Sequence, residues 1–412
     1  MLLHHLKMAW KVLWRRRFFT LLSLVGIGAT LMSLLIAVAL YDAAAGPRPP
    51  ETHPDRLLCA SMMSLDMGGG PLRTRPSHWL LTQGLAQVRA PATVGIASTE
   101  PLAAVAYVRG RKLPLNVKSA DAGFWRVLNF QFLEGGPYTA GQRGAGRPAV
   151  ISAGTARAYF GAAGGVVGRT MVLDQKNYRV LGVVEDVPAV RFHAHADVWV
   201  PYEPATMEMQ TDNPFGTSEA LILLPDKAAA PAVRAAFGRA LATVPLEPGM
   251  SLALPLETFA ESVAGRVLVQ YNWTDNPARL FRGLSAGAAL LLLLLPALNL
   301  VTMNISRMSE RAAEIGVRKA FGATAGALAG QFMVETLLLT LLGGVLGLLL
   351  ATLVLRGLSG GYLAAYGRIE PNLLVFGWGL LGSLVFGLLS GAYPAYRMAR
   401  LPAVEALKSA TV

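Results

Sequence analysis

The sequence carries little charge for a protein of its length. Only 15% of its 412 residues are Asp, Glu, Lys or Arg, whereas 53% are hydrophobic and the mean hydropathy is +0.44. A soluble globular chain usually has about a quarter of its residues charged. The shortage therefore argues against a wholly water-soluble protein. Cysteine is scarce too: Cys59 stands alone, which excludes an internal disulfide, and we interpret it as a small apolar residue near a strand.

Motifs for nucleotide binding and nucleophilic catalysis are missing from the sequence. A phosphate-binding loop needs G-x-x-x-x-G-K-[ST]. The nearest stretch, AGGVVGRT (163–170), has Ala163 for the first glycine and Arg169 for the lysine. We expect it to be a turn before a strand. The G-x-S-x-G motif of serine hydrolases is also missing. We therefore expect a non-catalytic chain that binds no cofactor itself.

A metal site is weakly suggested by the stretch RFHAHADVW, in which His193, His195 and Asp197 alternate. Residues at this spacing share one face of a strand and could bind a metal ion if a third partner such as Asp186 folded in. No further cluster of histidine or cysteine supports such a site. A polar strand edge is the favoured interpretation, so the sequence predicts no metal.

Four apolar runs are long enough to cross the hydrocarbon core of a bilayer, which takes about 20 residues. They cover residues 18–40, 284–303, 332–355 and 373–395, and the only charged residue in them is Glu335. The first run is longer than a typical signal-peptide core, and no small-residue cleavage site clearly follows it. We therefore predict four transmembrane helices.

The distribution of Lys and Arg beside these runs predicts their orientation, because cytoplasmic flanks are the basic ones. Residues 1–17 hold five basic residues and no acidic one, the 304–331 loop holds four basic residues and the 396–412 tail three. The short 356–372 loop has two. We therefore place both termini and the 304–331 loop in the cytoplasm, and residues 41–283 and the 356–372 loop outside.

The N-terminal residues LLHHLKMAWKVLWRRR have helical spacing of both apolar and basic side chains. This predicts a basic amphipathic helix over 1–17 on the inner membrane surface; a plain basic flank would satisfy the charges equally. The topology explains much of the net charge of +12. A nucleic-acid partner is therefore not expected.

The 243 residues from 41 to 283 are too many for a connecting loop and enough for a folded domain. Short strand-like runs and helical patterns alternate along them, which predicts an α/β or α+β domain. The predicted strands are 93–98, 103–110, 147–152, 170–174, 178–187 and 196–202, and the predicted helices are 78–88, 154–161 and 227–244.

A short charged stretch, SERAAEIGVRKAFGAT (309–324), separates the second and third apolar runs. Its five charged residues are Glu310, Arg311, Glu314, Arg318 and Lys319. Burying all five at mid-membrane would cost on the order of 12–17 kcal/mol, so the stretch stays in the cytoplasm. Ser309 is a suitable N-cap, Gly322 a suitable C-cap, and Glu314 precedes Arg318 in the favourable order. Together with the apolar Ile315, this predicts a short helix that a cytosolic partner can push; an ordinary solvated helix fits the periodicity equally.

Two polar residues of the apolar runs need explanation, Asn299 and Glu335. A carboxylate in hydrocarbon is costly. We expect Glu335 to bond to a neighbouring helix or to the 309–324 helix rather than to form a proton pathway. Glycine pairs at small-xxx-small spacing predict close contacts between helices. These pairs are Gly283/Gly287, Gly343/Gly347 and Gly387/Gly391.

Several segments resemble the MacB/FtsX-like family of ABC transporter permeases. The matching positions around the charged stretch are Asn299, Arg311, Glu314-Ile315-Gly316, Arg318, Gly322-Ala323, Gln331-Phe332, Glu335 and Gly343-Gly344. The tail matches at Pro394-Ala395, Arg397, Arg400, Pro402 and Glu405-Ala406-Leu407. VKSADAGFWRVLNFQFLEGG, RPAVISAGTARAYFG and VVGRTMVLDQKNYRVLGVVEDVP are similar to the family's periplasmic core domain.

This resemblance implies a permease of the mechanotransmission type in the bacterial inner membrane. The family's helix between the second and third spans docks on an ABC ATPase, and the permease works as a dimer, a homodimer or a pair of paralogues. Because the sequence starts at the amphipathic helix, we expect the ATPase, with its ATP and magnesium, on a separate chain. The outer region would have a porter-like part and an inserted smaller part.

The expected function is efflux of a small molecule or peptide with a periplasmic adaptor. Lipoprotein or lipid extraction by the same mechanism is one alternative. Another is a permease that moves no cargo and acts in signalling or controls a cell-wall hydrolase. The related cell-division permeases have a much smaller outer domain, so 243 residues argue against that role.

Overall fold

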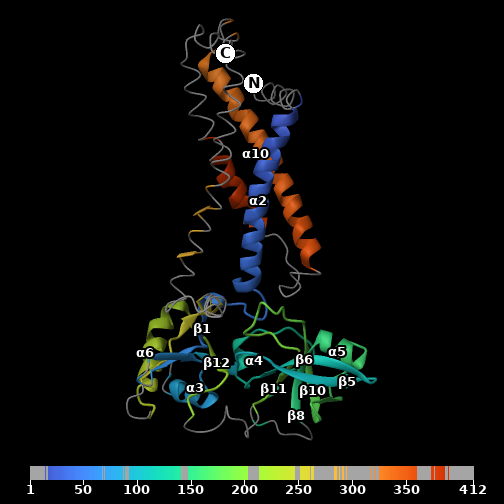
Figure 1. Ribbon diagram of the computed structural model, residues 1–412, viewed down its shortest axis with the longest axis vertical. Coiled ribbons are helices and arrows are strands. Elements are labelled where there is room, and N and C mark those ends of the chain that lie inside the picture. The colour runs from blue at the N-terminus through green and yellow to red at the C-terminus, as the bar shows by residue number, and fades with distance from the viewer. Residues whose placement is uncertain are drawn as a thin grey trace. The chain divides into compact units, whose positions relative to one another are not determined.

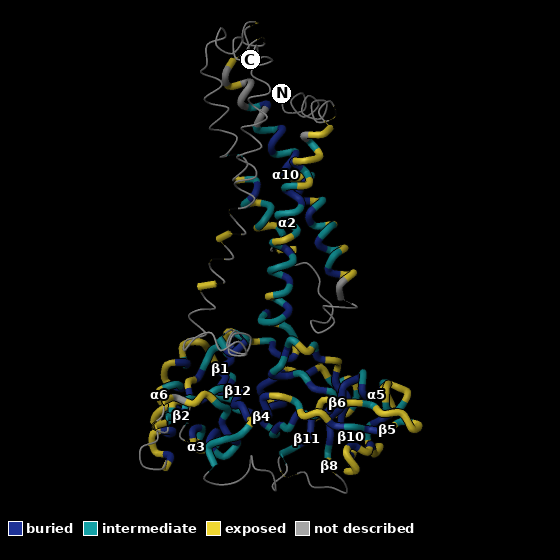
Figure 2. The backbone as a smooth tube through the Cα atoms, in the orientation of Figure 1, coloured by how far each residue is buried: buried dark blue, intermediate teal, exposed yellow. Residues whose placement is uncertain are grey.

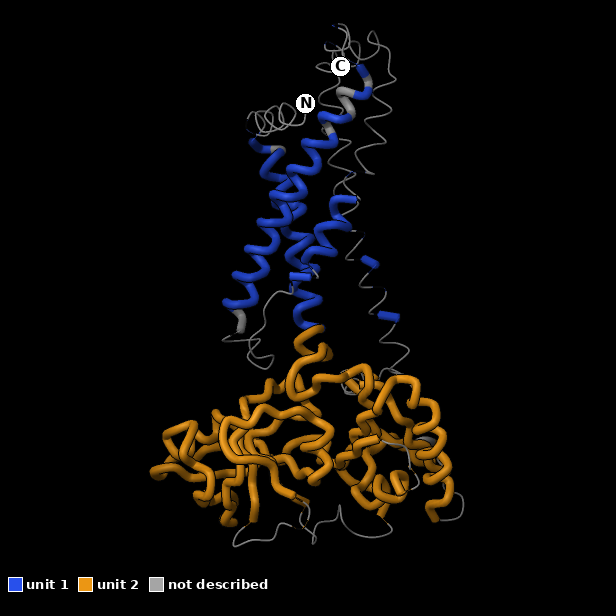
Figure 3. Tube along the Cα trace, turned by 180° about the vertical axis from the view of Figure 1, so that it is seen from behind, with its two compact units in different colours: residues 1–41, 282–364, 368–412 blue, residues 42–281, 365–367 orange. Residues whose placement is uncertain are grey.

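The computed structural model describes residues 17–66, 70–86, 92–139, 147–202, 213–245, 251–263, 324–359 and 373–385, apart from single positions within some ranges, and a few isolated residues elsewhere. The chain divides into two compact units (Figure 3). Unit 1 contains residues 1–41, 282–364 and 368–412, and unit 2 contains residues 42–281 and 365–367.

Unit 1 contains the long apolar helix α10 (Ala325–Ser359) and most of a second one, α2 (Arg17–Ala45), whose residues from Asp42 onward belong to unit 2 (Figure 1). In both, a stretch is long and apolar enough to cross a membrane, Thr20–Ala45 and Met333–Gly357. The predicted helices at 18–40 and 332–355 are therefore confirmed as helices. Of the run 373–395, a shorter apolar helix at Phe376–Val385 is described. The run 284–303 lies outside the described residues except for isolated positions.

Both long helices expose apolar side chains on one side. On α10 the exposed residues recur every four positions and so form one stripe. They are Leu341, Val345, Leu349 and Leu353, and the exposed residues of α2 are Phe18, Leu21, Leu22 and Val25. Figure 2 shows the exposed and buried positions of both helices. In water such stripes would be costly, whereas in a bilayer lipid covers them.

The sides of α2 and α10 that lie opposite these exposed stripes contact each other at glycines, which have no side chain to keep the two backbones apart. A Cβ on Gly343 would lie 2.7 Å from Ile27, and one on Gly347 would lie 2.8 Å from the carbonyl oxygen of Gly28. The predicted close contact at Gly343/Gly347 is thus confirmed. Gly283 and Gly287 are isolated described positions in a run that otherwise lies outside the described residues, so a close contact at that pair stays a prediction. Gly387 and Gly391 lie outside the described residues.

Unit 2 contains a four-stranded antiparallel sheet with helices on one face (Figure 1). Its strands, in spatial order, are β14 (Glu257–Thr258), β1 (Leu57–Ala60), β12 (Ser218–Leu223) and β4 (Thr93–Ser98). The covering helices are α3 (His78–Leu85) and α6 (Ala230–Leu241), which pack with alternate residues of β1, β12 and β4. The short helix η1 (Pro54–Arg56) precedes β1, and η3 (Lys227–Ala229) precedes α6.

A mixed seven-stranded sheet forms the second layer of unit 2. Its spatial order is β5 (Leu102–Val108), β6 (Arg111–Ser119), β11 (Val198–Val200), β8 (Arg147–Ser152), β10 (Lys176–Val184) and β7 (Phe132–Gly135), with β9 (Thr170–Leu173) paired to β10. Helix α5 (Ala153–Phe160) packs on one face. A three-stranded sheet is separate: β13 (Ser251–Ala253), β2 (Met63–Asp66) and β3 (Pro71–Thr74).

The two larger sheets share one apolar core on the faces that α3, α6 and α5 do not cover. Strand alternation sends Cys59 and Leu221 from the first sheet and Val150 and Trp199 from the second into this shared core. Helix α4 (Phe124–Val127) adds Phe124 and Trp125. Because both faces of β1 and β12 are covered, these strands are buried almost throughout.

The α/β character predicted for the outer region is confirmed, and so are the predicted helices and strands, with shifts of a few residues at their ends. Strands β4 and β8 begin and end where the sequence predicted. The AGGVVGRT stretch is a turn, and β9 begins at its last residue. The strand predicted over 196–202 is shorter, Val198–Val200, because the residues before it form a turn.

Candidate functional site

The predicted ATPase-coupling residues lie outside the described part of the chain. They are Glu310, Arg311, Glu314, Ile315, Arg318, Lys319 and Gly322, and the same holds for Asn299. Two neighbours are described: Val317 is 46% exposed and Phe321 is 89% exposed. The amide of Phe321 donates to the carbonyl of Val317 at 3.1 Å, the spacing of an α-helix.

Glu335 lies on the buried side of α10, where it is 5% exposed. The side-chain amide of Gln331, one turn earlier, donates to its Oε1 at 3.1 Å. Thr336 and Thr340 are buried as well, and the hydroxyl of Thr340 donates to the carbonyl of Thr336. The first half of α10 thus carries a buried polar stripe, which keeps these groups hydrogen-bonded inside the unit.

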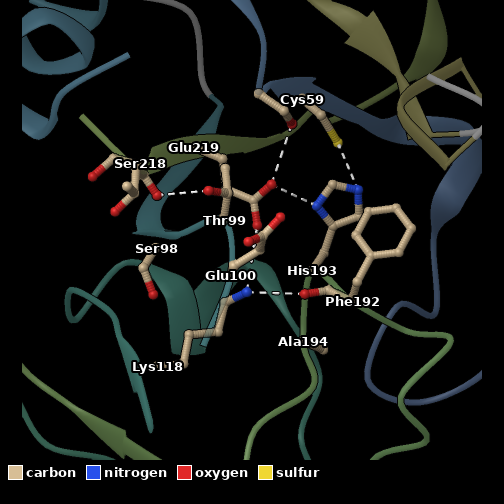
Figure 4. Close-up of polar contacts among 12 residues, drawn as sticks. Cys59, Ser98, Thr99, Glu100, Lys118, Phe192, His193, Ala194, Ser218 and Glu219 are labelled. Carbon is tan, nitrogen blue, oxygen red and sulfur yellow. Dashed lines mark hydrogen bonds and ion pairs between the residues drawn. The ribbon is translucent and has the colours of Figure 1, made fainter. Parts of the chain in front are cut away.

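The most concentrated polar site of the described residues lies in the shared core of unit 2 (Figure 4). Lys118 alternates with Leu115 and Val117 along β6, so its side chain enters the shared core rather than the α5 face. Glu219 enters the same core from β12. The Lys118 Nζ lies 3.6 Å from Glu219 Oε1, and both side chains are 0% exposed. This ion pair joins the two sheets.

His193 lies between the same two sheets. Its Nδ1 is 2.8 Å from Glu219 Oε2, and its Nε2 is 2.8 Å from the hydroxyl of Ser262. Ser61 also donates to Glu219 Oε2, at 3.2 Å. The Sγ of Cys59 lies 4.0 Å from His193 Nε2. Figure 4 shows Cys59, His193, Glu219 and Lys118 pointing toward one another.

The serine, histidine and glutamate have the mutual geometry of a nucleophile, its base and an orienting acid. The burial of these side chains argues against catalysis, because Ser262 is only 4% exposed and His193 only 1%. A substrate carbonyl cannot approach a hydroxyl that is closed off in this way. Burial also raises the pKa of the Cys59 thiol well above its usual value, which keeps the thiol protonated and a poor nucleophile. The arrangement is therefore a structural network.

A second buried ion pair lies where the chain leaves α2. Arg191 Nη1 is 3.2 Å from Glu51 Oε2, and the two side chains are 2% and 0% exposed. Its Nη2 donates to the carbonyl oxygen of Asp42, in the last turn of α2, at 3.3 Å. Burial raises the pKa of Glu51 to about 7, although Arg191 lowers it. Arg191 thus fastens the end of α2 and the segment after it to the loop before β11.

The residues weighed as metal ligands do not converge. His193 lies in a turn rather than in a strand, so the premise of a shared strand face is wrong. His195 Nδ1 contacts the carbonyl of Val187, and Asp197 accepts the amide of Asn116. Asp186 accepts the amide of Gly154 and pairs with Arg157 at the start of α5. Each side chain therefore has a different structural partner.

Sequence reasoning missed Lys118, Glu219, Glu51 and Arg191. Two signals were present: a lysine in the alternating run LPLNVKS, and a glutamate in the apolar strand SEALIL. A charge inside a run that is otherwise buried requires a partner of opposite charge. The partner is not predictable locally, because Glu51 and Arg191 lie 140 positions apart.

A chain with long apolar helices and a folded α/β unit belongs to the class of membrane-anchored proteins with a large domain outside the bilayer. The family model for the MacB-like periplasmic core domain matches residues 20–240, and the model for the FtsX-like permease C-terminal region matches residues 286–403. The protein therefore belongs to the MacB/FtsX-like family of ABC transporter permeases, as the sequence motifs predicted.

Curated relatives support this assignment. The chain is 26% identical to the pyoverdine export ATP-binding/permease protein PvdT of Pseudomonas aeruginosa, over 99% of this chain and 59% of the relative. It is 29% identical to the macrolide export ATP-binding/permease protein MacB of Sodalis glossinidius, over 98% of this chain and 60% of the relative. The chain thus spans about three-fifths of the length of these relatives.

Solved structures of related outer domains are more distant. The periplasmic region of MacB from Actinobacillus actinomycetemcomitans is 12% identical with a TM-score of 0.33, covering 50% of this chain and 92% of that one. The extracellular domain of the ABC-type transporter YknZ from Gram-positive bacteria is 13% identical with a TM-score of 0.32, covering 47% of this chain and 99% of that one.

Proposed function

We propose that this protein is the permease part of a bacterial ABC exporter that passes ATP-driven movement from an ABC ATPase to unit 2. The observation that carries the proposal is the course of α2. It is one helix from Arg17 to Ala45, it contains a stretch able to cross a membrane, and Asp42 near its end is held by Arg191 of the outer unit. A continuous helix transmits displacement along its axis better than a flexible linker does.

The proposal uses the predicted topology of four membrane spans at 18–40, 284–303, 332–355 and 373–395. The two described long helices, the apolar helix Phe376–Val385 and the basic flanks support it. Both termini and the 304–331 loop then lie in the cytoplasm, and unit 2 lies in the periplasm, on the outer side of the inner membrane.

The ATPase contact is proposed for the 309–324 stretch. Glu310, Arg311, Glu314, Arg318 and Lys319 would supply the charged surface. The exposed Val317 and Phe321 would add apolar contact area beside them. A short helix held at both ends by membrane spans would move with the ATPase and carry the spans with it.

Export is the favoured activity because the curated relatives named above are export proteins for pyoverdine and macrolides. We propose a small molecule or peptide as cargo and a periplasmic adaptor as partner. A dimer of permeases is proposed on the basis of the family. The spans as described carry one acidic residue, Glu335, and it is buried on α10, which favours cargo capture from the outer side over a polar path through the bilayer.

The proposed coupling is tested by reversing two charges, Glu314→Lys with Arg318→Glu, in the complete complex with its ATPase. The variant should lose co-purification with the ATPase and most of the ATP turnover that depends on the permease. The matched control reverses an exposed pair of the outer unit, Arg157→Asp with Asp186→Arg, whose side chains are 57% and 52% exposed. An intact complex with undiminished turnover after the first reversal would contradict the coupling role.

A further inference from the structure

Four consecutive residues, 191–194, each make a polar contact with a different part of unit 2. We name residues 191–194 the junction segment. Arg191 binds Glu51 and the carbonyl of Asp42, at distances of 3.2 and 3.3 Å. The carbonyl of Phe192 accepts Lys118 Nζ of β6 at 2.9 Å.

The next two residues add contacts with both sheets. His193 contacts Glu219 of β12 at 2.8 Å. The carbonyl of Ala194 accepts the indole N–H of Trp199, in β11, at 3.1 Å. The junction segment therefore contacts β12 of the four-stranded sheet and both β6 and β11 of the seven-stranded sheet.

The same segment contacts unit 2 near both ends of its described chain, at an outgoing stretch (42–51) and at a returning stretch (261–263). Arg191 contacts the outgoing stretch, at Asp42 and Glu51, directly after α2 crosses from unit 1 into unit 2. His193 contacts the returning stretch at Ser262, 2.8 Å away, which follows β14. Asp42 and Ser262 lie far apart in the sequence, yet their partners, Arg191 and His193, are only two positions apart.

We propose that the junction segment is the mechanical joint of unit 2: it receives movement from the outgoing and returning stretches and passes it to both sheets at once. Arg191 and His193 are then positioning residues for transport. The inference rests on the proposed function and adds the route of the movement. It predicts that the two sheets move as one body when the ATPase closes.

The physical basis is that these contacts are either ion pairs or directional hydrogen bonds, and that the side chains of both ion pairs are buried. Arg191, Glu51, Lys118 and Glu219 have side chains that are 0–2% exposed. Pulling such a pair apart leaves an unpaired charge in an apolar core, which costs far more than separating an exposed pair. A purely apolar seam can slide, because dispersion contacts are not directional. The junction therefore transmits displacement rather than absorbing it.

The test removes the joint while keeping the core filled. In the double variant Glu51→Met with Arg191→Met, two apolar side chains replace a buried ion pair, an exchange that proteins often tolerate. The complete permease with its ATPase is reconstituted in liposomes and labelled at Leu349→Cys and Tyr107→Cys. Both positions are exposed, and the native Cys59 is buried. The distance between the labels is measured without nucleotide and with a non-hydrolysable ATP analogue.

The inference predicts that the nucleotide-dependent change in distance falls about fivefold or more in the double variant. ATPase binding and the thermal unfolding midpoint should be retained. The matched control, Arg157→Met with Asp186→Met, removes an exposed pair and should behave like the unmodified protein. An unchanged distance shift in the double variant would overturn the junction role. If the unmodified complex itself shows no shift, the proposed function fails rather than this inference.

A second measurement needs no variant and covers the case in which the double variant does not fold. Hydrogen exchange of the unmodified complex is followed with and without the nucleotide analogue. Nucleotide should change amide protection in residues 42–51, in the junction segment and in β12 together. A change in 42–51 without one in the junction segment would contradict the proposal. A conservative variant, Arg191→Lys, keeps the charge but not the fork of two donors, and should show an intermediate distance shift.

Discussion

The two units bring their elements into close contact by opposite means. In unit 1, α2 and α10 approach where side chains are missing, at Gly28, Gly343 and Gly347. In unit 2, charges are paired inside the fold: Lys118 with Glu219 between the two sheets, and Arg191 with Glu51 between the loop before β11 and the segment after α2. Helices in a bilayer gain little from burying apolar surface, because lipid is apolar too, so close backbone contact is what remains.

The outer unit folds in contact with water, so the hydrophobic effect stabilises the burial of its apolar side chains. The buried ion pairs are therefore not needed to bring the two sheets together. Replacing a buried pair by apolar residues is often neutral, whereas breaking it is costly. The comparison shows that the membrane helices are held together by close backbone packing at glycines. The outer sheets are held by their apolar core, and ion pairs additionally define their arrangement.

The largest predicted effect comes from breaking the pair that joins the sheets. Lys118→Met removes the ammonium group beside Glu219 inside the shared core, leaves that carboxylate with its other partners, His193 and Ser61, and should cost about 3–5 kcal/mol of unfolding free energy. Thermal unfolding, followed by the fluorescence of the buried Trp125 and Trp199, measures it. Arg157→Met is the control and should cost at most about 1 kcal/mol, because its pair is exposed. Equal losses in both variants would break the comparison.

A smaller effect is expected at the helix contact. Gly347→Ala places a Cβ 2.8 Å from the backbone carbonyl of Gly28, which cannot rotate away, and should cost about 1–3 kcal/mol. The matched control on the same helix is Gly357→Ala, where a Cβ would meet nothing within 4 Å among the described residues outside its own helix. Unfolding by SDS in mixed micelles measures both variants. A destabilised control with an unaffected Gly347→Ala would refute the assigned contact.

The smallest predicted effect is a change in pH dependence. Burial, with the nearby Glu261 charge, raises the pKa of Glu257 from 4.5 to about 7, and Arg73 opposes this. Since the folded state holds this proton more tightly than the unfolded state, the stability that Glu257 contributes is fully present below about pH 4.5 and is lost as pH rises toward 7. Glu257→Gln should reduce, but not abolish, the decline of the unfolding midpoint between pH 4.5 and 7; a steeper decline would show the opposite sign.

Much of the fold was accessible from local sequence patterns. The residues of β4 and β8 were predicted because apolar, β-branched runs are bounded by turn residues. The Gly343/Gly347 contact was predicted from spacing and is confirmed by the approach to Ile27 and Gly28. Spacing alone does not say which helix lies opposite a glycine pair.

The candidate site was harder to predict from the sequence. His193 was noticed as a histidine, but its assignment to a strand face with His195 and Asp197 was wrong, because a turn at 192–194 directs the side chains apart. Lys118 and Glu219 were not noticed, since neither has an oppositely charged residue near it in its own strand. Their structural role depends on pairing with a residue from another sheet, which local sequence patterns do not reveal.

The sequence by itself determined that the chain has long membrane-length helices and an interleaved α/β region, because length, hydropathy and periodicity act on neighbouring residues. It also determined the family, through motifs that lie close together along the chain. Only the tertiary structure decided which buried charges meet, and that residues 191–194 contact both Asp42 and Ser262. Ion pairing in a core depends on distances in space, and its partners here lie as far as 140 residues apart.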